Sequence, residues 1–99
     1  MLFRVEYSSE SEEHLRRLTA FQQVVVLDTV DEQLTHEPHI ETRNRKPMRP
    51  NPVAPWELRI GELRVYYEFV TDPEPIVLVR AVGEKSHNRV TIGGKEVEL

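Results

Sequence analysis

The 99-residue chain contains no cysteine, which excludes disulfide bonds, thiolate metal sites and cysteine nucleophiles. It has no apolar run near the roughly 20 residues that a bilayer demands, so no membrane partner is expected. The first residues lack the basic start and long apolar stretch of a secretion signal, which favours the cytoplasm. With 38% hydrophobic residues there is apolar material for one core, and a single domain over residues 1–99 is predicted.

An overall excess of positive charge is also missing, because 13 Lys and Arg face 17 Asp and Glu, a net charge of −4. Taken alone, this argues against nucleic acid as a partner. The charge is unevenly spread, however: residues 1–41 carry −6, residues 42–64 carry +4 and residues 65–99 carry −2. Such asymmetry is typical of a chain in which one region faces an anion and another does not.

The first 37 residues predict a strand followed by two helices. Residues 2–7 alternate between apolar and charged side chains, as a strand does. Ser9 and Glu12 have the spacing of a capping box, which begins a helix. A second helix is expected over 19–37 and ends before Pro38, with its apolar side formed by Ala20, Val24, Leu27, Val30 and Leu34.

The segment from Pro38 to Pro55 holds five prolines and is predicted to be an extended loop. Four cations fall within its seven positions 43–49, namely Arg43, Arg45, Lys46 and Arg49. A solvated loop is the ordinary interpretation of such a run. A surface that binds a phosphate backbone is the alternative.

The second half predicts strands. Residues 56–60 and 63–69 alternate on either side of Gly61-Glu62, which indicates a hairpin with a two-residue turn. Residues 76–82 read as a strand covered on both faces, and residues 90–92 and 95–99 flank Gly93-Gly94 as a C-terminal hairpin. The element order predicts one α+β domain.

The register of the first hairpin places Arg59 opposite Arg64. Like charges directly opposite each other destabilise a sheet unless something neutralises them. Either Glu57 and Glu68 compensate the arginines locally, or the pair holds a bound anion. The apolar side chains of both strands are expected to face the helices. The two arginines and Tyr66 then lie on the opposite face, where guanidinium groups suit phosphate.

The stretch Leu58–Tyr67, with Leu-Arg-x-Gly-x-x-Arg-Val-x-Tyr, and the turn Val82-Gly83-Glu84-Lys85 resemble the RelE/ParE superfamily of bacterial type II toxins. The resemblance covers nearly the whole chain. It implies a RelE-like microbial ribonuclease-type fold: an N-terminal strand, two helices, then a mostly antiparallel curved sheet with a C-terminal hairpin. It also implies a cognate antitoxin as partner. RelE-like members cleave messenger RNA on the ribosome without a metal or other cofactor, whereas ParE-like members poison DNA gyrase.

The resemblance also implies site residues. Arg64 matches the family arginine that stabilises the scissile phosphate, and Lys85 matches the basic residue after the central strand. Thr91 takes the place of a catalytic tyrosine, and His87 is the available substitute as proton donor, or else a solvent-facing turn residue. The residues expected to bind RNA are Arg43, Arg45, Lys46, Arg49, Arg59, Tyr66 and Arg89. For Tyr66, stacking on a base and packing in the sheet remain open.

Three functions follow as hypotheses. The first is a toxin that inhibits translation as a ribosome-dependent endoribonuclease. The second is a non-enzymatic gyrase poison, for which the missing tyrosine is no handicap. The third is a non-toxic homologue that binds an antitoxin.

Overall fold

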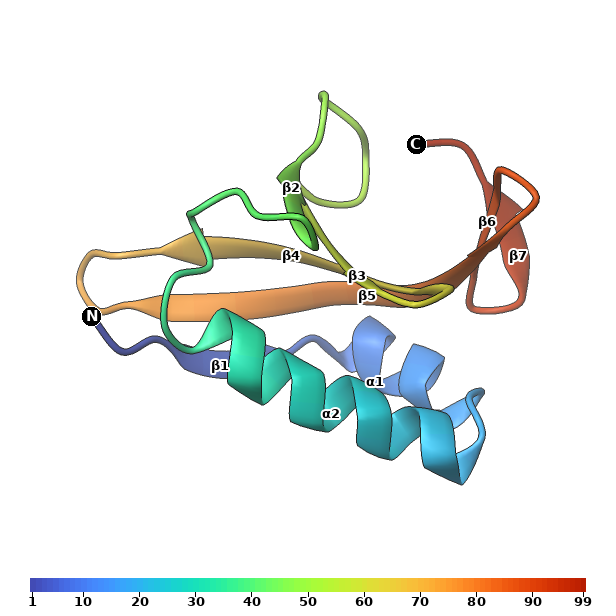
Figure 1. The fold of residues 1–99 in the computed structure, drawn as a ribbon, viewed down its shortest axis with the longest axis horizontal. Helices are drawn as coiled ribbons and strands as arrows, with labels where there is room; N and C mark the ends of the chain where they lie inside the picture. Colours follow the sequence, from blue (N-terminus) through green and yellow to red (C-terminus); the bar gives the residue numbers. More distant parts are fainter.

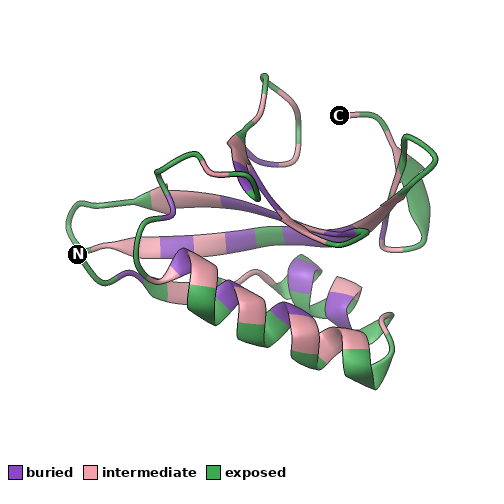
Figure 2. Cartoon of the chain, in the orientation of Figure 1, coloured by how far each residue is buried: buried purple, intermediate pink, exposed green.

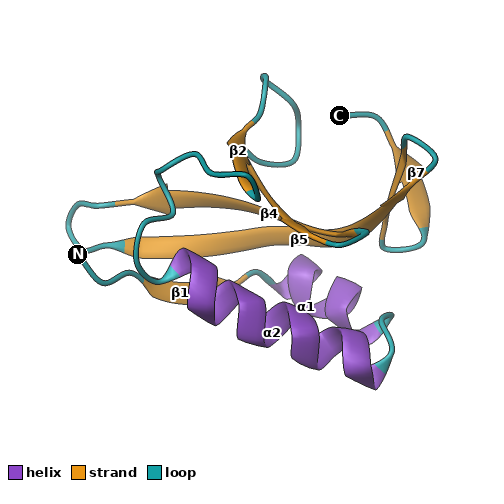
Figure 3. Cartoon of the chain, viewed as in Figure 1, coloured by secondary structure: helices purple, strands orange, loops and turns teal.

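Two helices cover one face of a seven-stranded, mostly antiparallel sheet in the computed structural model, which describes residues 1–99 (Figure 1, Figure 3). The elements are β1 (Arg4–Tyr7), α1 (Ser9–Arg16), α2 (Ala20–Leu34), β2 (Arg45–Pro47), β3 (Trp56–Ile60), β4 (Leu63–Val70), β5 (Ile76–Ser86), β6 (Arg89–Ile92) and β7 (Lys95–Val97). This confirms the predicted α+β fold with its N-terminal strand, two helices and C-terminal hairpin. No helix has the length and apolar character to cross a membrane.

The long strand β5 organises the sheet. The strands follow the order β2-β3-β4-β5-β6-β7, and β1 joins β5 in parallel on the same edge that β6 occupies further along. Between these two partners, α1 and its N-cap residue supply side chains to the edge of β5. The Ser8 hydroxyl donates to the carbonyl of Arg80 at 3.2 Å, and His14 Nδ1 accepts from the amide of Val82 at 3.2 Å. Side chains of the first helix thus satisfy backbone groups that no strand reaches.

The helix boundaries differ slightly from the prediction. The N-cap of α1 is Ser8, whose hydroxyl accepts from the amide of Ser11 at 3.1 Å, so the predicted box of Ser9 and Glu12 is wrong by one residue. Thr19 and Gln22 form a full capping box on α2. This helix ends at Leu34, before Pro38, because the carbonyl of Thr35 accepts from the amide of Phe3 and the chain turns toward β1.

The buried side of α2 agrees with the prediction at Val30 and Leu34 but differs from it toward the start of the helix. Its buried residues are Val26, Val30 and Leu34, which pack on the sheet, whereas Val24 and Leu27 face solvent. In Figure 2 the helix is purple toward the sheet and green along its outward side. The three valines at 24–26 cover much of the helix circumference. Periodicity alone therefore predicted the wrong buried side for this part of the helix, with Val24 in place of Val26.

The hairpin of β3 and β4 has the predicted register, with Arg59 opposite Arg64 and Leu58 opposite Val65. Gly61 takes φ +60 in its turn, a conformation that glycine adopts without strain. The apolar side chains of both strands join the helix-facing core, as predicted. A second, smaller cluster lies on the other face of the sheet and consists of Ala54, Tyr66, Ala81 and Ile92.

Several strands have bounds that the sequence did not predict. Residues 45–47 of the expected loop form β2, which pairs with β3 through Lys46 and Glu57. Strand β5 continues to Ser86, and a bulge at Arg80 shifts its register between Tyr66 and Tyr67 of β4. The last strand ends at Val97, two residues short of the predicted end.

Candidate functional site

On the face opposite the helices the sheet is curved, with both of its ends bending away from the helices (Figure 1). We call this face the concave face. Cross-strand pairing arranges its polar residues in two rows. One row runs from Lys46 through Glu57 to Tyr66, and the next contains Arg59 and Arg64. Neighbouring strands place these side chains beside one another on one surface.

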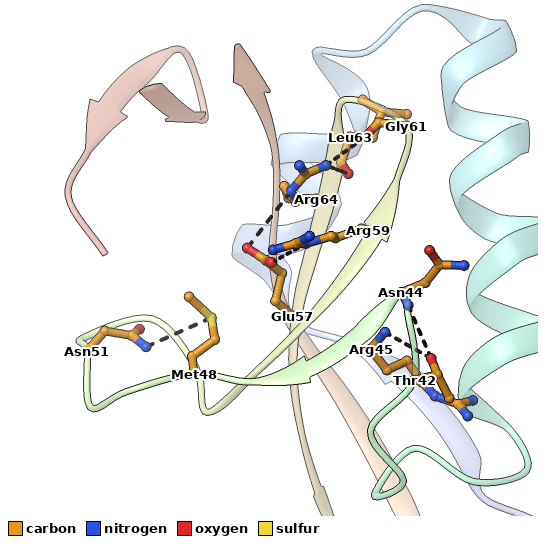
Figure 4. A network of polar contacts seen from close by, with 10 residues as sticks. All are labelled: Thr42, Asn44, Arg45, Met48, Asn51, Glu57, Arg59, Gly61, Leu63 and Arg64. Atoms are coloured by element: carbon orange, nitrogen blue, oxygen red, sulfur yellow. Dashed lines mark hydrogen bonds and ion pairs between the residues drawn. The ribbon is translucent and has the colours of Figure 1, made fainter. Parts of the chain in front are cut away.

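Glu57 lies beside the two arginines, and its carboxylate reaches both (Figure 4). Its carboxylate accepts from Arg59 Nε at 3.2 Å and forms an ion pair with Arg64 Nε at 3.9 Å. Arg64 Nη1 donates to the carbonyls of Gly61 and Leu63, at 2.7 and 2.8 Å. Local compensation by Glu57 therefore resolves the repulsion that the register creates. Glu68, the other acid considered for this role, pairs with Arg80 instead.

Two buried polar atoms at this place have no hydrogen-bond partner, namely Arg64 Nε and the Tyr66 hydroxyl. Burial raises the pKa of Tyr66 above its ordinary value of 10, and the charge of Glu57 adds to the effect. The hydroxyl therefore keeps its proton at neutral pH. Unpartnered buried polar atoms are few in native proteins, so their occurrence next to Glu57 marks this spot as a candidate binding site.

A cleft of about 450 Å³ opens beside these residues. Its wall from the β2–β3 connection includes Arg49, which donates to the carbonyl of Leu99 at 3.3 Å. The opposite wall includes Arg89, which pairs with Glu96 at 3.7 Å. Lys85 lines the same cleft and forms no ion pair. The cleft thus combines cations and acids rather than presenting a purely basic surface.

Comparison with solved structures finds chains of similar fold. A chain of the toxin-antitoxin complex RelBE2 from Mycobacterium tuberculosis superposes with a TM-score of 0.72 at 21% sequence identity, over 86% of this chain and 100% of that one. The chain has a RelE-like α+β fold. No protein-family model matches the sequence, and no curated protein matches it.

On this RelE-like fold, the concave face and its cleft bring together six of the residues predicted from the sequence. Lys46, Arg59 and Arg64 follow from strand pairing, and Arg49 and Lys85 line the cleft. Arg89 borders the cleft from the opposite wall. Arg43 is exposed in the preceding loop and forms no ion pair.

Two predicted RNA-binding residues are instead structural. Arg45 is buried, and its guanidinium donates to the carbonyl of Gln33 at 2.6 Å and to that of Ile40 at 3.2 Å. It therefore fixes the end of α2 rather than facing the concave side. Tyr66 is fully buried in the small cluster with Ala81, so its ring has no free face for a base, and the packing alternative holds.

His87 and Thr91 lie outside the cleft. His87 sits in the β5–β6 turn with φ 53, and it borders a different hollow together with Glu84 and Thr91. Thr91 pairs with Glu84, whereas Val90 pairs with Lys85. Because side chains alternate along strands, Thr91 faces away from the side that carries Lys85.

The sequence predicts only a compensating role for Glu57, whereas the structure makes it the carboxylate of the candidate site. The signal was present in the hairpin pattern, because Glu57 is two residues before Arg59 and therefore shares its face. No cluster of His, Asp or Glu residues has the geometry to hold a metal ion.

Proposed function

We propose that this protein is the toxin of a type II toxin-antitoxin pair, and that its concave face cleaves messenger RNA on the ribosome. The RelE-like fold and the similarity to a chain of a toxin-antitoxin complex support the toxin assignment. The observation that carries the ribonuclease assignment is the group of Arg59, Arg64 and Lys85 around a carboxylate on one concave surface. Such cations bind and stabilise phosphate.

The chemistry follows from the ion pairs of Glu57. A substrate phosphate competes with the carboxylate for Arg59 and Arg64, and so releases Glu57 beside the ribose. Glu57 then accepts the proton of the 2′-hydroxyl as this oxygen attacks phosphorus. The bond to the 5′-oxygen breaks, this oxygen takes a proton from water, and a 2′,3′-cyclic phosphate remains. Arg64 and Lys85 stabilise the charge that develops on the phosphate.

The test compares two site variants with a matched surface variant. We expect Arg64→Ala and Lys85→Ala to abolish growth arrest and messenger cleavage on purified ribosomes. Arg80→Ala should stay toxic, because Arg80 pairs with Glu68 outside the cleft. Thermal melting confirms that each variant is folded. If both site variants arrest growth as the wild type does, the proposed ribonuclease site is wrong.

One observation favours a second candidate, a non-enzymatic gyrase poison. The arginines on the concave face and in its cleft each already have a carboxylate or carbonyl partner, namely Arg49, Arg59, Arg64 and Arg89. Thr91, which takes the place of the catalytic tyrosine, faces away from the side that carries Lys85. A binding toxin needs no proton-transfer group. Induction should then change plasmid supercoiling and damage DNA while translation continues. If expression of the protein alone does not arrest growth, the result favours a non-toxic homologue that binds an antitoxin.

A further inference from the structure

The hydroxyl of Tyr66 is a polar group of the concave face that the free protein leaves without a partner. The side chain is fully buried, and its hydroxyl forms no hydrogen bond. The ring packs among apolar side chains, namely Ala54, Ala81 and Ile92. A buried hydroxyl without a partner costs free energy, and a phenylalanine would fill the same space without that cost. Packing therefore accounts for the ring of Tyr66 but not for its hydroxyl.

Two charged side chains lie close to this hydroxyl. Strand pairing places Tyr66 directly opposite Glu57, and residues in such a pair share one face of the sheet. Burial raises the pKa of Tyr66, the charge of Glu57 raises it further, and Arg64 opposes them. The phenol therefore stays protonated at neutral pH. It is a hydrogen-bond donor beside a carboxylate that other groups engage.

The carboxylate of Glu57 is held by cations in the free protein. It accepts from Arg59 Nε at 3.2 Å and forms an ion pair with Arg64 Nε at 3.9 Å, while only 10% of the Glu57 side chain is exposed. In the proposed reaction a phosphate takes both arginines. A carboxylate this deeply buried then needs another hydrogen bond, because an unpaired buried charge is costly. The other charged residues that face it form no ion pair with Glu57, namely Lys46 on β2 and, along the cleft, Arg49, Lys85, Arg89, Glu96 and Glu98.

We propose that Tyr66 is a positioning residue for Glu57, and that its hydroxyl donates to the carboxylate once a substrate phosphate has taken Arg59 and Arg64. This inference rests on the proposed ribonuclease function and adds the residue that orients its base. A neutral donor holds the carboxylate in place and keeps it ionised, without the full positive charge that would weaken it as a base. Tyr66 keeps its own proton throughout, while Glu57 receives the proton of the 2′-hydroxyl.

The experiment compares Tyr66→Phe with Tyr67→Phe as matched control. Tyr67 is the next residue of β4 and is equally buried, but it faces the helices, and its hydroxyl donates to the carbonyl of Pro38 at 2.7 Å. We expect Tyr66→Phe to lower kcat for messenger cleavage on purified ribosomes at least about 10-fold, the effect of one hydrogen bond to a charged group. KM and the affinity for 2′-O-methyl RNA should stay at wild-type values, because the phosphate contacts are unchanged. Tyr67→Phe should keep wild-type kinetics.

Two further measurements separate positioning from a structural role. The pH at which cleavage falls to half its plateau should rise in Tyr66→Phe, because a carboxylate that loses a donor binds its proton more readily. The urea midpoint of Tyr66→Phe should equal or exceed that of the wild type, since the free protein loses no hydrogen bond. Tyr67→Phe should show the opposite pattern, with a lower urea midpoint and the wild-type pH profile.

The outcomes distinguish this role from the proposed function. Wild-type kcat and pH profile in Tyr66→Phe would overturn the positioning role and leave the ribonuclease assignment standing. Weaker binding of 2′-O-methyl RNA with an unchanged kcat would place the hydroxyl on the phosphate and would overturn the role as well. A lower urea midpoint without a shifted pH profile would show a structural hydroxyl, with the same consequence. If Arg64→Ala cleaves messenger as the wild type does, the proposed function fails and the role of Tyr66 fails with it.

Discussion

At the scale of single residues, Glu57 determines how much positive charge the concave face presents. Its carboxylate engages both Arg59 and Arg64, so three charged groups together contribute one net positive charge. A competing anion such as a phosphate can take the place of the carboxylate. The same residue therefore limits binding in the free protein and supplies a base in the proposed complex.

We predict opposite effects of Glu57→Gln on binding and on cleavage. The variant keeps the shape of the side chain and frees the two arginines, so affinity for 2′-O-methyl RNA should rise about 5-fold, roughly 1 kcal/mol. Cleavage should fall by about 10² to 10⁴, the usual contribution of a general base. Fluorescence anisotropy and initial rates measure the two effects. Glu68→Gln is the control. If Glu57→Gln cleaves RNA at the wild-type rate, Glu57 is not the general base.

His14 gives the fold a dependence on pH. Its Nδ1 accepts from the Val82 amide, which requires the unprotonated imidazole. Burial lowers its pKa from the ordinary 6.5; Arg17 acts in the same direction, whereas Glu10 and Glu13 oppose them. Because the unfolded chain binds the proton more readily, the stabilisation is complete above about pH 6.5 and declines as the pH falls below it.

We therefore predict that the free energy of unfolding in urea decreases between pH 7 and pH 5, and that His14→Asn reduces this decrease. The asparagine oxygen accepts the Val82 amide at every pH in this range. Subtraction of the two profiles removes the contribution of the carboxylates. Identical pH profiles for the two proteins would show that His14 makes no such contribution.

At the scale of elements, Arg45 joins β2 to the end of α2. Its buried guanidinium donates to two carbonyls, so we predict that Arg45→Ala lowers the free energy of unfolding by about 2–3 kcal/mol. Arg43→Ala, in the same loop but exposed, should change it by less than about 0.5 kcal/mol. Urea denaturation measures both. Equal stability of the two variants would show that the hydrogen bonds of Arg45 do not stabilise the fold.

The elements also show what the sequence was able to predict. The Gly61-Glu62 turn determines the hairpin register, and with it the opposition of Arg59 and Arg64, because the side-chain period of a strand is two. The helix phase was mispredicted because Val24, Val25 and Val26 fit several phases equally well. Only the position of the sheet decides that Val26 is buried and Val24 exposed.

The candidate site was only partly predictable for a similar reason. The cations between 43 and 49 were identified by composition, which does not show that Arg45 points toward the helices while Lys46 pairs across from Glu57. That difference follows from the pairing of β2, and nothing in a proline-rich segment predicted a strand. The position of Thr91 on the other face likewise depends on the β5–β6 register.

At the scale of the whole molecule, the ion pairs predict a shallow salt dependence of RNA binding. Lys46 and Lys85 are the cations of the concave face whose side chains have neither an acidic partner nor a backbone carbonyl partner, whereas Arg49 donates to the carbonyl of Leu99. Two phosphate contacts to single-stranded RNA give a slope of about −1.4 for log K against log salt. Glu57→Gln should steepen the slope by up to about 1.4, as two arginines become available. A wild-type slope steeper than about −4 would contradict this account.

The parallel pairing of Arg4 with Ile76 bears on when the chain folds during its synthesis. The first strand and both helices leave the ribosome early, yet Val26, Val30 and Leu34 have no surface to pack on until β3, β4 and β5 exist. Contacts between distant residues form late, because the intervening chain must first be closed into a loop. The nascent chain therefore completes its fold only after β5 has emerged. The concave face, to which β3, β4 and β5 all contribute, therefore exists only in a chain whose synthesis is nearly complete.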